Sequence, residues 1–466
     1  MIASGLSAAD LAPLVADFTS QGLPSGDAEQ AAACWAHTAL VILWLEDRDL
    51  LPTRVRDGQD LPGQWAKGVE GLAAHPATAG FADPDVNPAV RVTPSESAAA
   101  PLAATLAAGP DHGWTTWPTG DAYQTLSTQA VKTRALVQTP RFVADLIVKC
   151  TVGRAMLDLG DTARDIRVVD PACGTGHLLL TALSAVRHLP HRNGTRRTWD
   201  AVDSVRGVDL DPYAALVARW RLAVECLGYP RPKTWGDLDH DLPIHAAAAN
   251  SLLDDHPLLT HGQYHAVVAN PPYVTVKDPV QRETVRAAYR DVCKGKYTLA
   301  VPFTVLLHQL AAPGGWVGQI TSNAFMKREF GRPLIETFLP TVDLRWVIDT
   351  SGAYIPGHGT PTVILVSRNR RPTGDKIRAV LGKRGEPTTP ADPSKGLVWT
   401  SIRDAVERAE SGDRIQQMYE YSLTEAARNG DTRAAAALAA TKVGDASPEP
   451  PVSSTAAQQM TLWDAA

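Results

Sequence analysis

Short apolar runs alternate with longer helix-forming stretches over residues 121–372, and this alternation constrains the fold more than any other feature. The runs are IRVVD, AVDSVRGVDL, YHAVVANPP, GGWVGQIT, LRWVIDT and TPTVILVSR. Because each run has the length and β-branched content of one strand, the pattern predicts a parallel, doubly wound α/β sheet. Such a sheet binds ligands at the carboxyl ends of its strands, so functional side chains are expected there.

The rest of the chain divides by composition into four segments. Residues 1–95 have the apolar periodicity of helices and are predicted to form a helical N-terminal domain. Residues 96–120 are rich in Ala, Pro, Gly and Ser, which predicts a linker. Residues 373–440 combine a basic loop with predicted helices, and the proline-rich residues 441–466 are predicted to be a disordered tail.

Charge and cysteine content exclude several classes of protein. The net charge is −5, so nucleic acid would have to be bound by a local basic patch. The five cysteines include no CxxC pair, which argues against a zinc site or a disulfide framework and predicts a cytoplasmic location. The start, MIASGLSAADLAPL, lacks the basic region of a signal peptide, and the run AACWAHTALVILWL is too short to span a bilayer.

The stretch DPACGTG follows the first predicted strand and has the composition of a ligand-binding turn. Asp170 ends the strand, and Gly174 and Gly176 would let a ligand approach the backbone at the N-terminus of the next helix. A simple corner between strand and helix would account for a lone GxG. The acid, the proline and both glycines together favour a cofactor-binding turn.

The next two strands also end in polar residues. Asp209 would accept hydrogen bonds from ribose hydroxyls, and Leu210 would lie against the flat face of an adenine. Asp211 is the better candidate for the N-cap of the following helix. Asn250 falls at the expected end of the third strand, where its amide would either contact an adenine edge or form a surface turn.

The fourth strand ends in a rigid tetrapeptide, Asn270-Pro271-Pro272-Tyr273. Proline lacks a backbone N–H and fixes φ, so this segment is predicted to be held extended. The side-chain carbonyl of Asn270 and the backbone carbonyl of Pro271 make a pair of acceptors suited to an exocyclic amino group, and Tyr273 supplies a stacking surface. A plain turn that ends the strand is the alternative. The position downstream of DPACGTG favours the functional interpretation.

The series DPACGTG, GVDLDP, NSLL and NPPY resembles the ordered motifs of N6-adenine DNA methyltransferases. QTPRFVADLIV resembles the family's preceding cofactor motif, AYIPGHGTPTVILVSRN resembles BREX-type phage-defence methyltransferases, and LVILWLEDRDLLP is similar to helical regions in those and in type IIG enzymes. The resemblance implies a Rossmann-like class I methyltransferase sheet that binds S-adenosyl-L-methionine. The cofactor-binding residues that it implies are Thr139, Pro140, Asp170, Pro171, Ala172, Gly174, Gly176, Asp209, Leu210, Asn250 and Ser251. The family usually has an acid where this chain has Asn250.

The reaction implied by the resemblance is methyl transfer from S-adenosylmethionine to N6 of adenine in DNA, in a phage-defence or restriction-modification system. Asn270 and Pro271, held by Pro272, would orient the amino group, and Tyr273 would stack on the flipped base. Positioning and electrostatics suffice for such a transfer, so no metal is expected. The alternatives are a methyltransferase acting on RNA bases or on a protein glutamine, or a cofactor-binding scaffold in a defence complex.

Three basic groups are candidates for contact with the DNA backbone. The first, beside the tetrapeptide and interleaved with acids, is Lys277, Arg282, Arg286, Arg290, Lys294 and Lys296. The second is Lys327, Arg328 and Arg332. The third is Arg368, Arg370, Arg371, Lys376, Arg378, Lys383 and Arg384. Charge runs are usually only solvated faces, but the position of the first group favours a role in binding.

Two protein partners are also predicted. Larger members of the family carry a long C-terminal target-recognition region for which this chain has no room, so sequence specificity is expected from a separate subunit or to be relaxed. Near the C-terminus, Gln459, Met460, Thr461, Leu462 and Trp463 resemble the short peptides that bind the bacterial DNA sliding clamp. The alternative is that the tail folds back, with Trp463 packed on the catalytic domain.

Overall fold

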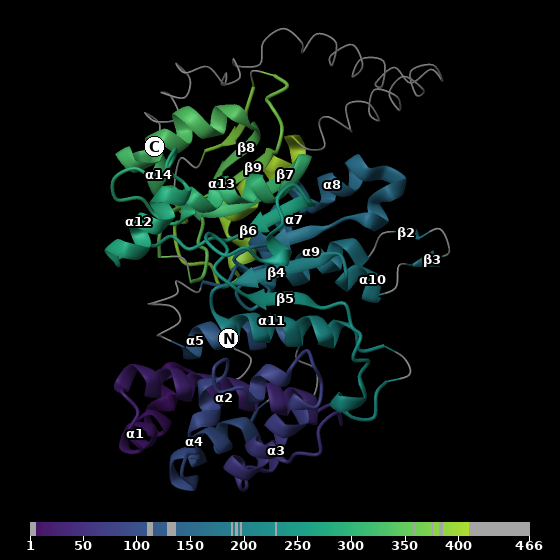
Figure 1. Cartoon of the computed structure of the whole chain (residues 1–466), viewed down its shortest axis with the longest axis vertical. Coiled ribbons are helices and arrows are strands. Elements are labelled where there is room, and N and C mark those ends of the chain that lie inside the picture. Colours follow the sequence, from purple (N-terminus) through teal and green to yellow (C-terminus); the bar gives the residue numbers. More distant parts are fainter. Residues whose placement is uncertain are drawn as a thin grey trace. The chain divides into compact units, whose positions relative to one another are not determined.

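The structure is a computed structural model, and it falls into two compact units, Met1–Gln319 and Ile320–Ala466, which are described one at a time. Figure 1 shows their helices and strands. The residues described are 6–109, 115–127, 137–187, 190–191, 194–195, 198–228, 231–357, 359–374, 376–381 and 385–409. In these ranges, no helix is both long and apolar enough to cross a membrane.

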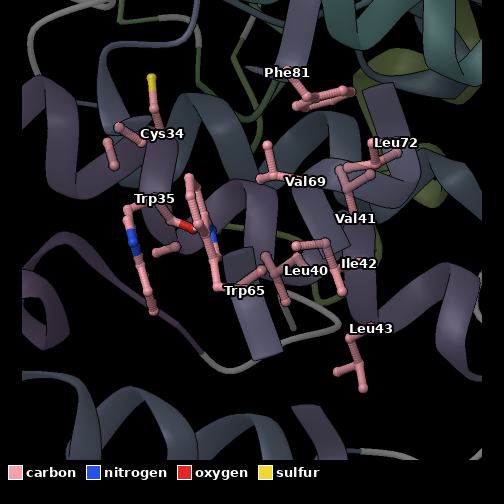
Figure 2. Packing of buried hydrophobic residues seen from close by; sticks show 14 of the residues in the cluster. Cys34, Trp35, Leu40, Val41, Ile42, Leu43, Trp65, Val69, Leu72 and Phe81 are labelled. Carbon is pink, nitrogen blue, oxygen red and sulfur yellow. The ribbon is translucent and has the colours of Figure 1, made fainter. Parts of the chain in front are cut away.

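The first unit begins with helices that pack around one buried helix, α2. The helices are α1 (Ala12–Ser20), α2 (Ser25–Glu46), α3 (Leu61–Ala73), α4 (Glu96–Ala107) and α5 (Thr116–Leu126). Every residue of α2 from Ala31 to Leu45 is buried, since it is apolar on all faces. Trp35 of α2 stacks on Trp65 of α3 with ring centroids 5.4 Å apart, and Figure 2 shows these rings among the aliphatic side chains.

The predicted linker at 96–120 is wrong, because most of this segment is helical. Ser95 caps α4 by accepting a hydrogen bond from the N–H of Ala98, and Leu102 and Leu106 are buried. The alanines that suggested a linker are the strongest helix formers, and here they pack closely in the core. The N-terminal helices and the first five main strands therefore belong to the same compact unit rather than to two domains.

The sheet of the first unit has the strand order β7-β6-β1-β4-β5, and these strands run parallel. Their bounds are β1 (Val168–Asp170), β4 (Val205–Asp209), β5 (His245–Ala248), β6 (Tyr264–Ala269) and β7 (Ala311–Ser322), the last of which continues into the second unit. The chain leaves β1 toward β4 and β5 and then returns to place β6 on the other side of β1. This reversal creates a switch point between β1 and β6, where ligands bind in such sheets.

Helices connect these strands and join them to the N-terminal helices. They are α7 (Arg141–Cys150), α8 (Val152–Leu159), α9 (His177–Arg187), α10 (Thr198–Val202), α11 (Pro212–Glu225), α12 (Pro279–Ala288) and α13 (Ala300–Leu310), with a small hairpin of β2 (Pro190–His191) and β3 (Gly194–Thr195). In Figure 1, α5 and α11 lie between the purple N-terminal helices and the strands. Trp220 of α11 packs edge-on against Trp44 of α2, so one core runs from the N-terminal helices to the sheet.

Short helical turns complete the first unit. They are η1 (Ala8–Leu11), η2 (Val55–Asp57), η3 (Ala79–Ala82), η4 (Pro88–Arg91), η5 (Gly160–Asp165), η6 (Trp235–Asp237) and η7 (Pro257–Leu259).

The second unit contains β8 (Asp343–Asp349), β9 (Thr362–Arg368), β10 (Arg378–Val380) and the short helix α14 (Ala324–Lys327). Its turns are η8 (Glu329–Gly331), η9 (Leu334–Phe338), η10 (Leu339–Thr341) and η11 (Pro393–Lys395). β8 is antiparallel to β9 and parallel to β10. The strands of the first unit form the predicted parallel sheet, and the antiparallel pair of β8 and β9 is a feature that the apolar pattern did not predict. A parallel connection needs a crossover helix, whereas the described residues between β8 and β9 form turns.

The C-terminal predictions are addressed only in part by the described residues. Residues 397–409 are helical, within the segment predicted to combine a basic loop and helices. The predicted tail at 441–466, with the clamp-like peptide, lies outside the described residues, as do Lys383 and Arg384.

The contact of α2 with α3 predicts the effect of a Gly68→Ala substitution. A Cβ at Gly68 would lie 2.5 Å from Cδ1 and 2.6 Å from Cγ1 of Ile42, so the added methyl group overpacks the interface. We expect the free energy of unfolding, measured in urea, to fall by about 1 to 3 kcal/mol. The matched control is Gly153→Ala, another helical glycine, whose Cβ would meet its nearest atom at 3.8 Å. Equal stability of both variants would contradict this account of the packing.

Candidate functional site

A glycine turn forms the base of the candidate site. β1 ends at Asp170 and α9 begins at His177, so the intervening residues must reverse direction within a few positions. Gly174 and Gly176 have φ values of 52° and 93°, in the left-handed region that favours glycine. A Cβ at Gly176 would also lie 3.2 Å from Cβ of Ala218 in α11, so glycine lets the turn approach that helix closely.

Asp209, at the end of β4, links its strand to the glycine turn. Its Oδ2 accepts a hydrogen bond of 2.7 Å from the N–H of Gly174, and its Oδ1 accepts one of 2.8 Å from the N–H of Asp211. Asp170 is buried beside it and accepts a hydrogen bond from the N–H of Ala172. Burial, reinforced by the charge of Asp209, raises the pKa of Asp170 well above its usual value.

These groups open onto a pocket at the switch point between β1 and β6, with an empty volume of about 480 Å³. The lining residues are Val137, Gln138, Thr139, Asp170, Ala172, Cys173, Gly174, His177, Leu178, Asp209, Asp211, Asn270 and Pro272. The pocket therefore brings together residues predicted to bind a cofactor and two residues of the predicted catalytic tetrapeptide.

Other residues predicted to bind the cofactor have different local roles. Ser251 donates a hydrogen bond of 2.6 Å to the carbonyl of Pro171 and so supports the glycine turn. Oδ1 of Asn250 accepts from the N–H of Leu252, which is the surface turn named as the alternative. Leu210 is 55% exposed, a large apolar side chain left uncovered directly after Asp209. Pro140 directly precedes α7.

The tetrapeptide after β6 is hydrogen-bonded within the protein. Nδ2 of Asn270 donates to the carbonyl of Val137 and to Oγ1 of Thr139, each at 3.1 Å. Oδ1 of Asn270 accepts a hydrogen bond of 2.6 Å from the hydroxyl of Tyr273. The oxygen predicted to accept from a target amino group thus already has an internal donor. Burial raises the pKa of Tyr273, which keeps its hydroxyl protonated and able to donate.

Sequence reasoning missed two buried polar residues of the pocket, His177 and Gln138. His177 is 2% exposed, and burial lowers its pKa to about 4, so the ring is neutral at physiological pH. Its Nδ1 lies 2.6 Å from Oε1 of Gln138, and its Nε2 lies 3.1 Å from Oδ1 of Asp121. The available signal was position, since His177 directly follows DPACGTG and Gln138 is the first residue of QTPRFVADLIV.

Asp211 was predicted as the N-cap of α11, and this is confirmed. Its Oδ1 accepts hydrogen bonds from the N–H groups of Tyr213 and Ala214. Its Oδ2 also accepts one of 3.0 Å from the hydroxyl of Tyr123 in α5. The same carboxylate therefore caps α11, lines the pocket and bonds α5.

The basic residues of the first group fall into two classes. Lys277, Arg290, Lys294 and Lys296 are exposed. Arg286 instead pairs with Glu283 and donates to the carbonyl of Gly295, and its contact with phosphate stays a prediction. The half-buried Arg282 donates to the carbonyl of Val276 at 3.4 Å.

The basic residues of the second unit show the same division. Lys327 and Arg328 are exposed around the end of α14. Arg332 pairs with Glu336, and Arg370 pairs with the buried Asp343, both at 2.8 Å. Exposure alone does not identify a binding surface, so these residues stay predictions as DNA contacts.

The strand order, the turn after β1 and the tetrapeptide after β6 define a class I methyltransferase fold, whose cofactor is S-adenosylmethionine. The pocket fits this cofactor, because it offers a glycine turn at a helix N-terminus and a carboxylate at the end of the adjacent strand. Residues 203–355 match the family model described as Eco57I restriction-modification methylase. Residues 203–355 are therefore assigned to an Eco57I-type restriction-modification methylase domain.

Individual relatives agree with this assignment. The chain is 40% identical over 357 residues to the adenine-specific methyltransferase PglX of Streptomyces coelicolor, an alignment covering 66% of this chain and 29% of that protein. It is 27% identical to the type II methyltransferase M.BanIII of Aneurinibacillus aneurinilyticus, over 45% of this chain and 34% of the relative. The chain thus spans about a third, or less, of the length of these relatives.

Solved structures support the fold. The chain is similar to the type IIL restriction-modification enzyme MmeI in complex with DNA, with a TM-score of 0.56 and 15% identity over 83% of this chain and 60% of that one. It is also similar to the type IIG restriction endonuclease BpuSI, with a TM-score of 0.51 and 13% identity over 89% and 48% of the two chains.

The two hydrogen bonds of Asp209 predict the effect of Asp209→Ala on cofactor binding. The substitution removes the acceptor predicted for ribose and releases the N–H of Gly174. Calorimetry should show the affinity for S-adenosylmethionine lowered about tenfold or more, as for loss of a charged hydrogen bond. Asp254→Ala is the control, since the side chain of Asp254 bonds only the N–H of Asn250, in the turn after β5, among the hydrogen bonds described. Unchanged affinity in Asp209→Ala would refute the assignment of this carboxylate to the cofactor.

Proposed function

We propose that this chain transfers a methyl group from S-adenosylmethionine to N6 of adenine in DNA, as part of a phage-defence or restriction-modification system. The observation that carries the proposal is the position of Asn270, whose side chain lines the cofactor pocket directly after β6. An amide at this position can hold an amino group beside a bound methyl donor.

The contacts of Asn270 determine which end of its amide is available. The carbonyl of Val137 can only accept, so the nitrogen of Asn270 must face it, at 3.1 Å. Oδ1 therefore points away from Val137, toward the side of Tyr273. A carbonyl oxygen held in this way accepts a hydrogen bond from an exocyclic amino group and favours the positive charge that develops on the nitrogen during transfer.

The hydroxyl of Tyr273 occupies this oxygen in the present geometry. A carbonyl oxygen has two lone pairs, so a target amino group must either share Oδ1 with Tyr273 or displace the hydroxyl. In the proposed reaction the ring of Tyr273 stacks on the extruded adenine, and Pro271 contributes its backbone carbonyl as the second acceptor. The protein positions the two reactants, and no covalent intermediate with a side chain is required.

DNA is the proposed substrate, and two observations support it. The curated relatives are an adenine-specific methyltransferase and a type II methyltransferase, and MmeI was solved in complex with DNA. In the first unit, Lys277, Lys294 and Lys296 are exposed on the segment that follows the tetrapeptide. The separate specificity subunit and the sliding clamp, as partners, stay predictions.

Substitution of Asn270 tests the proposed reaction. Asn270→Ala removes the acceptor for the target amine, so transfer of a labelled methyl group to plasmid DNA should fall about a hundredfold or more. Gln263→Ala is the matched control, because it removes an exposed side-chain amide at the opposite end of β6, where Oε1 accepts a hydrogen bond from Arg167. The assay is run with and without the products of neighbouring genes, which shows whether methyl transfer requires a partner protein. Transfer by Asn270→Ala at the parent rate would exclude this amide from catalysis.

Two substitutions of Tyr273 separate its ring from its hydroxyl. Tyr273→Phe keeps the stacking surface and removes the internal donor to Asn270, so methyl transfer should be retained or increased. Tyr273→Ala removes the stacking surface and should cost about 1 to 3 kcal/mol in kcat/KM. An equal loss in both variants would show that the hydroxyl itself is required and would contradict this division of roles.

A further inference from the structure

A second pocket lies within the unit Ile320–Ala466, and the proposed reaction does not use it. It is bounded by η9 and η10, by the start of β8 and by the loop between β9 and β10. The lining residues are Ile335, Leu339, Pro340, Val342, Asp343, Leu344, Pro372, Gly374, Lys376 and Ile377. Five of them have branched aliphatic side chains and two are prolines, so the walls favour an apolar occupant.

Two irregular stretches of backbone shape this pocket. Residues Leu334–Phe338 form a single π-helical turn, η9, which includes the lining residue Ile335. The pairing of β8 with β9 shifts register between Leu344 and Trp346, as it does at a β-bulge. Both kinds of irregularity interrupt regular hydrogen bonding and are frequent at functional sites. Their meeting at one apolar pocket favours a role in binding.

The charged residues of the pocket define the polar part of its occupant. Nε of Arg370 donates a hydrogen bond of 2.9 Å to the buried carboxylate of Asp343, and Nη2 lies 2.8 Å from the same oxygen, so this negative charge is balanced within the protein. Lys376 is exposed and has no ion pair among the described residues. An occupant that matches the pocket therefore has apolar side chains next to a carboxylate.

The surroundings of the pocket are basic, although the whole chain is acidic. Residues 320–384 contain eleven lysines and arginines against five aspartates and glutamates, whereas the net charge of the chain is −5. Residues 441–466 have the opposite balance, with three acids and one lysine. Opposite net charges favour the association of these two parts of the chain.

One short segment of the acidic region combines apolar side chains with a carboxylate. Leu462 and Trp463 are directly followed by Asp464, and these residues lie outside the described part of the structure. No other pair of adjacent large apolar residues occurs in the sequence of 441–466. Large apolar side chains in a polar stretch gain free energy when they are removed from water. The segment therefore has the composition that the pocket requires.

A second apolar cluster, in residues 415–423, is the competing occupant. Its apolar side chains are spread over nine positions and are separated by Gln, Glu and Ser. Such spacing suits one face of a helix better than a single pocket. The compact pair of Leu462 and Trp463 is the better match.

We propose that this pocket binds Leu462 and Trp463 of the same chain, with the carboxylate of Asp464 beside Lys376. Burial of the two apolar side chains supplies most of the free energy, and an ion pair at the exposed rim adds little. Fifty-two residues separate Ala409 from Leu462. Even a wholly helical connection of that length would extend about 80 Å, more than the diameter of a small domain, so the segment can reach the pocket.

Fluorescence anisotropy with a labelled peptide of residues 455–466 tests the proposal. The full-length chain carrying Leu462→Ala and Trp463→Ala should bind the peptide, because its own segment no longer fills the pocket. The full-length parent should bind the peptide about tenfold more weakly or less, since its tethered segment competes at a high local concentration. Equal affinity for both proteins, or no binding to either, would overturn the proposal.

A substitution in the apolar wall locates the binding site. Leu344→Glu, added to the double variant, places a charge in the wall and should lower the affinity for the peptide about tenfold or more. Leu397→Glu is the matched control, because it makes the same change at a leucine that is 66% exposed and outside the lining. The same affinity in both variants would exclude this pocket as the site.

Reversal of charge tests the ion pair with substitutions that leave the apolar walls intact. Lys376→Glu, added to the double variant, should weaken peptide binding about twofold to fivefold, and a peptide carrying Asp464→Lys should restore it. Lys327→Glu, at an exposed lysine outside the lining, should leave the affinity unchanged. Absence of restoration by the exchanged peptide would remove Lys376 from the proposed contact.

Two other outcomes would assign the segment to a different partner. Binding of the peptide to purified sliding clamp, without binding to the double variant, would overturn the proposal in favour of the clamp. Sedimentation of the parent as a dimer, when the double variant is a monomer, would show that the segment docks on a second copy of the chain. Docking within one chain predicts the same sedimentation for both proteins.

Discussion

The rest of the structure depends on the hydrogen bonds that the buried carboxylate of Asp211 accepts. A buried charge is tolerated only when hydrogen bonds replace its lost hydration. Asp211 obtains them from the start of α11 and from the hydroxyl of Tyr123 in α5. Gln30 of α2 donates to Tyr123 in turn, at 2.9 Å. The pocket wall and the N-terminal helices are therefore stabilised by the same hydrogen-bond network.

A second chain of contacts extends this network into α2. The hydroxyl of Tyr213 lies 3.0 Å from Nδ1 of His37, whose Nε2 lies 2.8 Å from the carbonyl of Thr119. Burial lowers the pKa of His37 to about 4, which keeps the ring neutral and allows it to serve as one donor and one acceptor. Polar residues inside an otherwise apolar helix thus have specific partners on α5 and α11.

The sequence was sufficient for the strands and for the motifs at their ends, because both depend on local pattern. The six apolar runs each contain a strand, and Asp170, Asp209 and Asn270 stand at the predicted edge of the sheet. The linker at 96–120 was mispredicted because alanine and serine are compatible with both loops and packed helices, and only the tertiary core decides between them. The antiparallel pairing of β8 with β9 depends on the path of the connection, which apolar periodicity does not encode.

The site was predictable in its residues but not in their hydrogen bonds. Nothing in NPPY indicates that Tyr273 bonds Asn270, or that the amide nitrogen is held by Val137 from a segment more than a hundred residues earlier. His177 follows DPACGTG and Gln138 opens QTPRFVADLIV, yet neither motif indicates that His177 contacts Gln138 on one side and Asp121 of α5 on the other. Contacts between distant segments are a property of the folded chain, which a single sequence does not display.

The bond between Tyr123 and Asp211 has a consequence for how such enzymes diversify. Recombination that joins the N-terminal helices of one family member to the strands of another would take Tyr123 and Asp211 from different parents. The hydrogen bond between them supports the wall of the cofactor pocket. A hybrid gene whose crossover point lies between α5 and α11 keeps this bond only if one parent supplies the tyrosine and the other supplies the aspartate. The methylase core and its helical neighbour are therefore expected to be inherited together, with exchange of modules confined to regions beyond them.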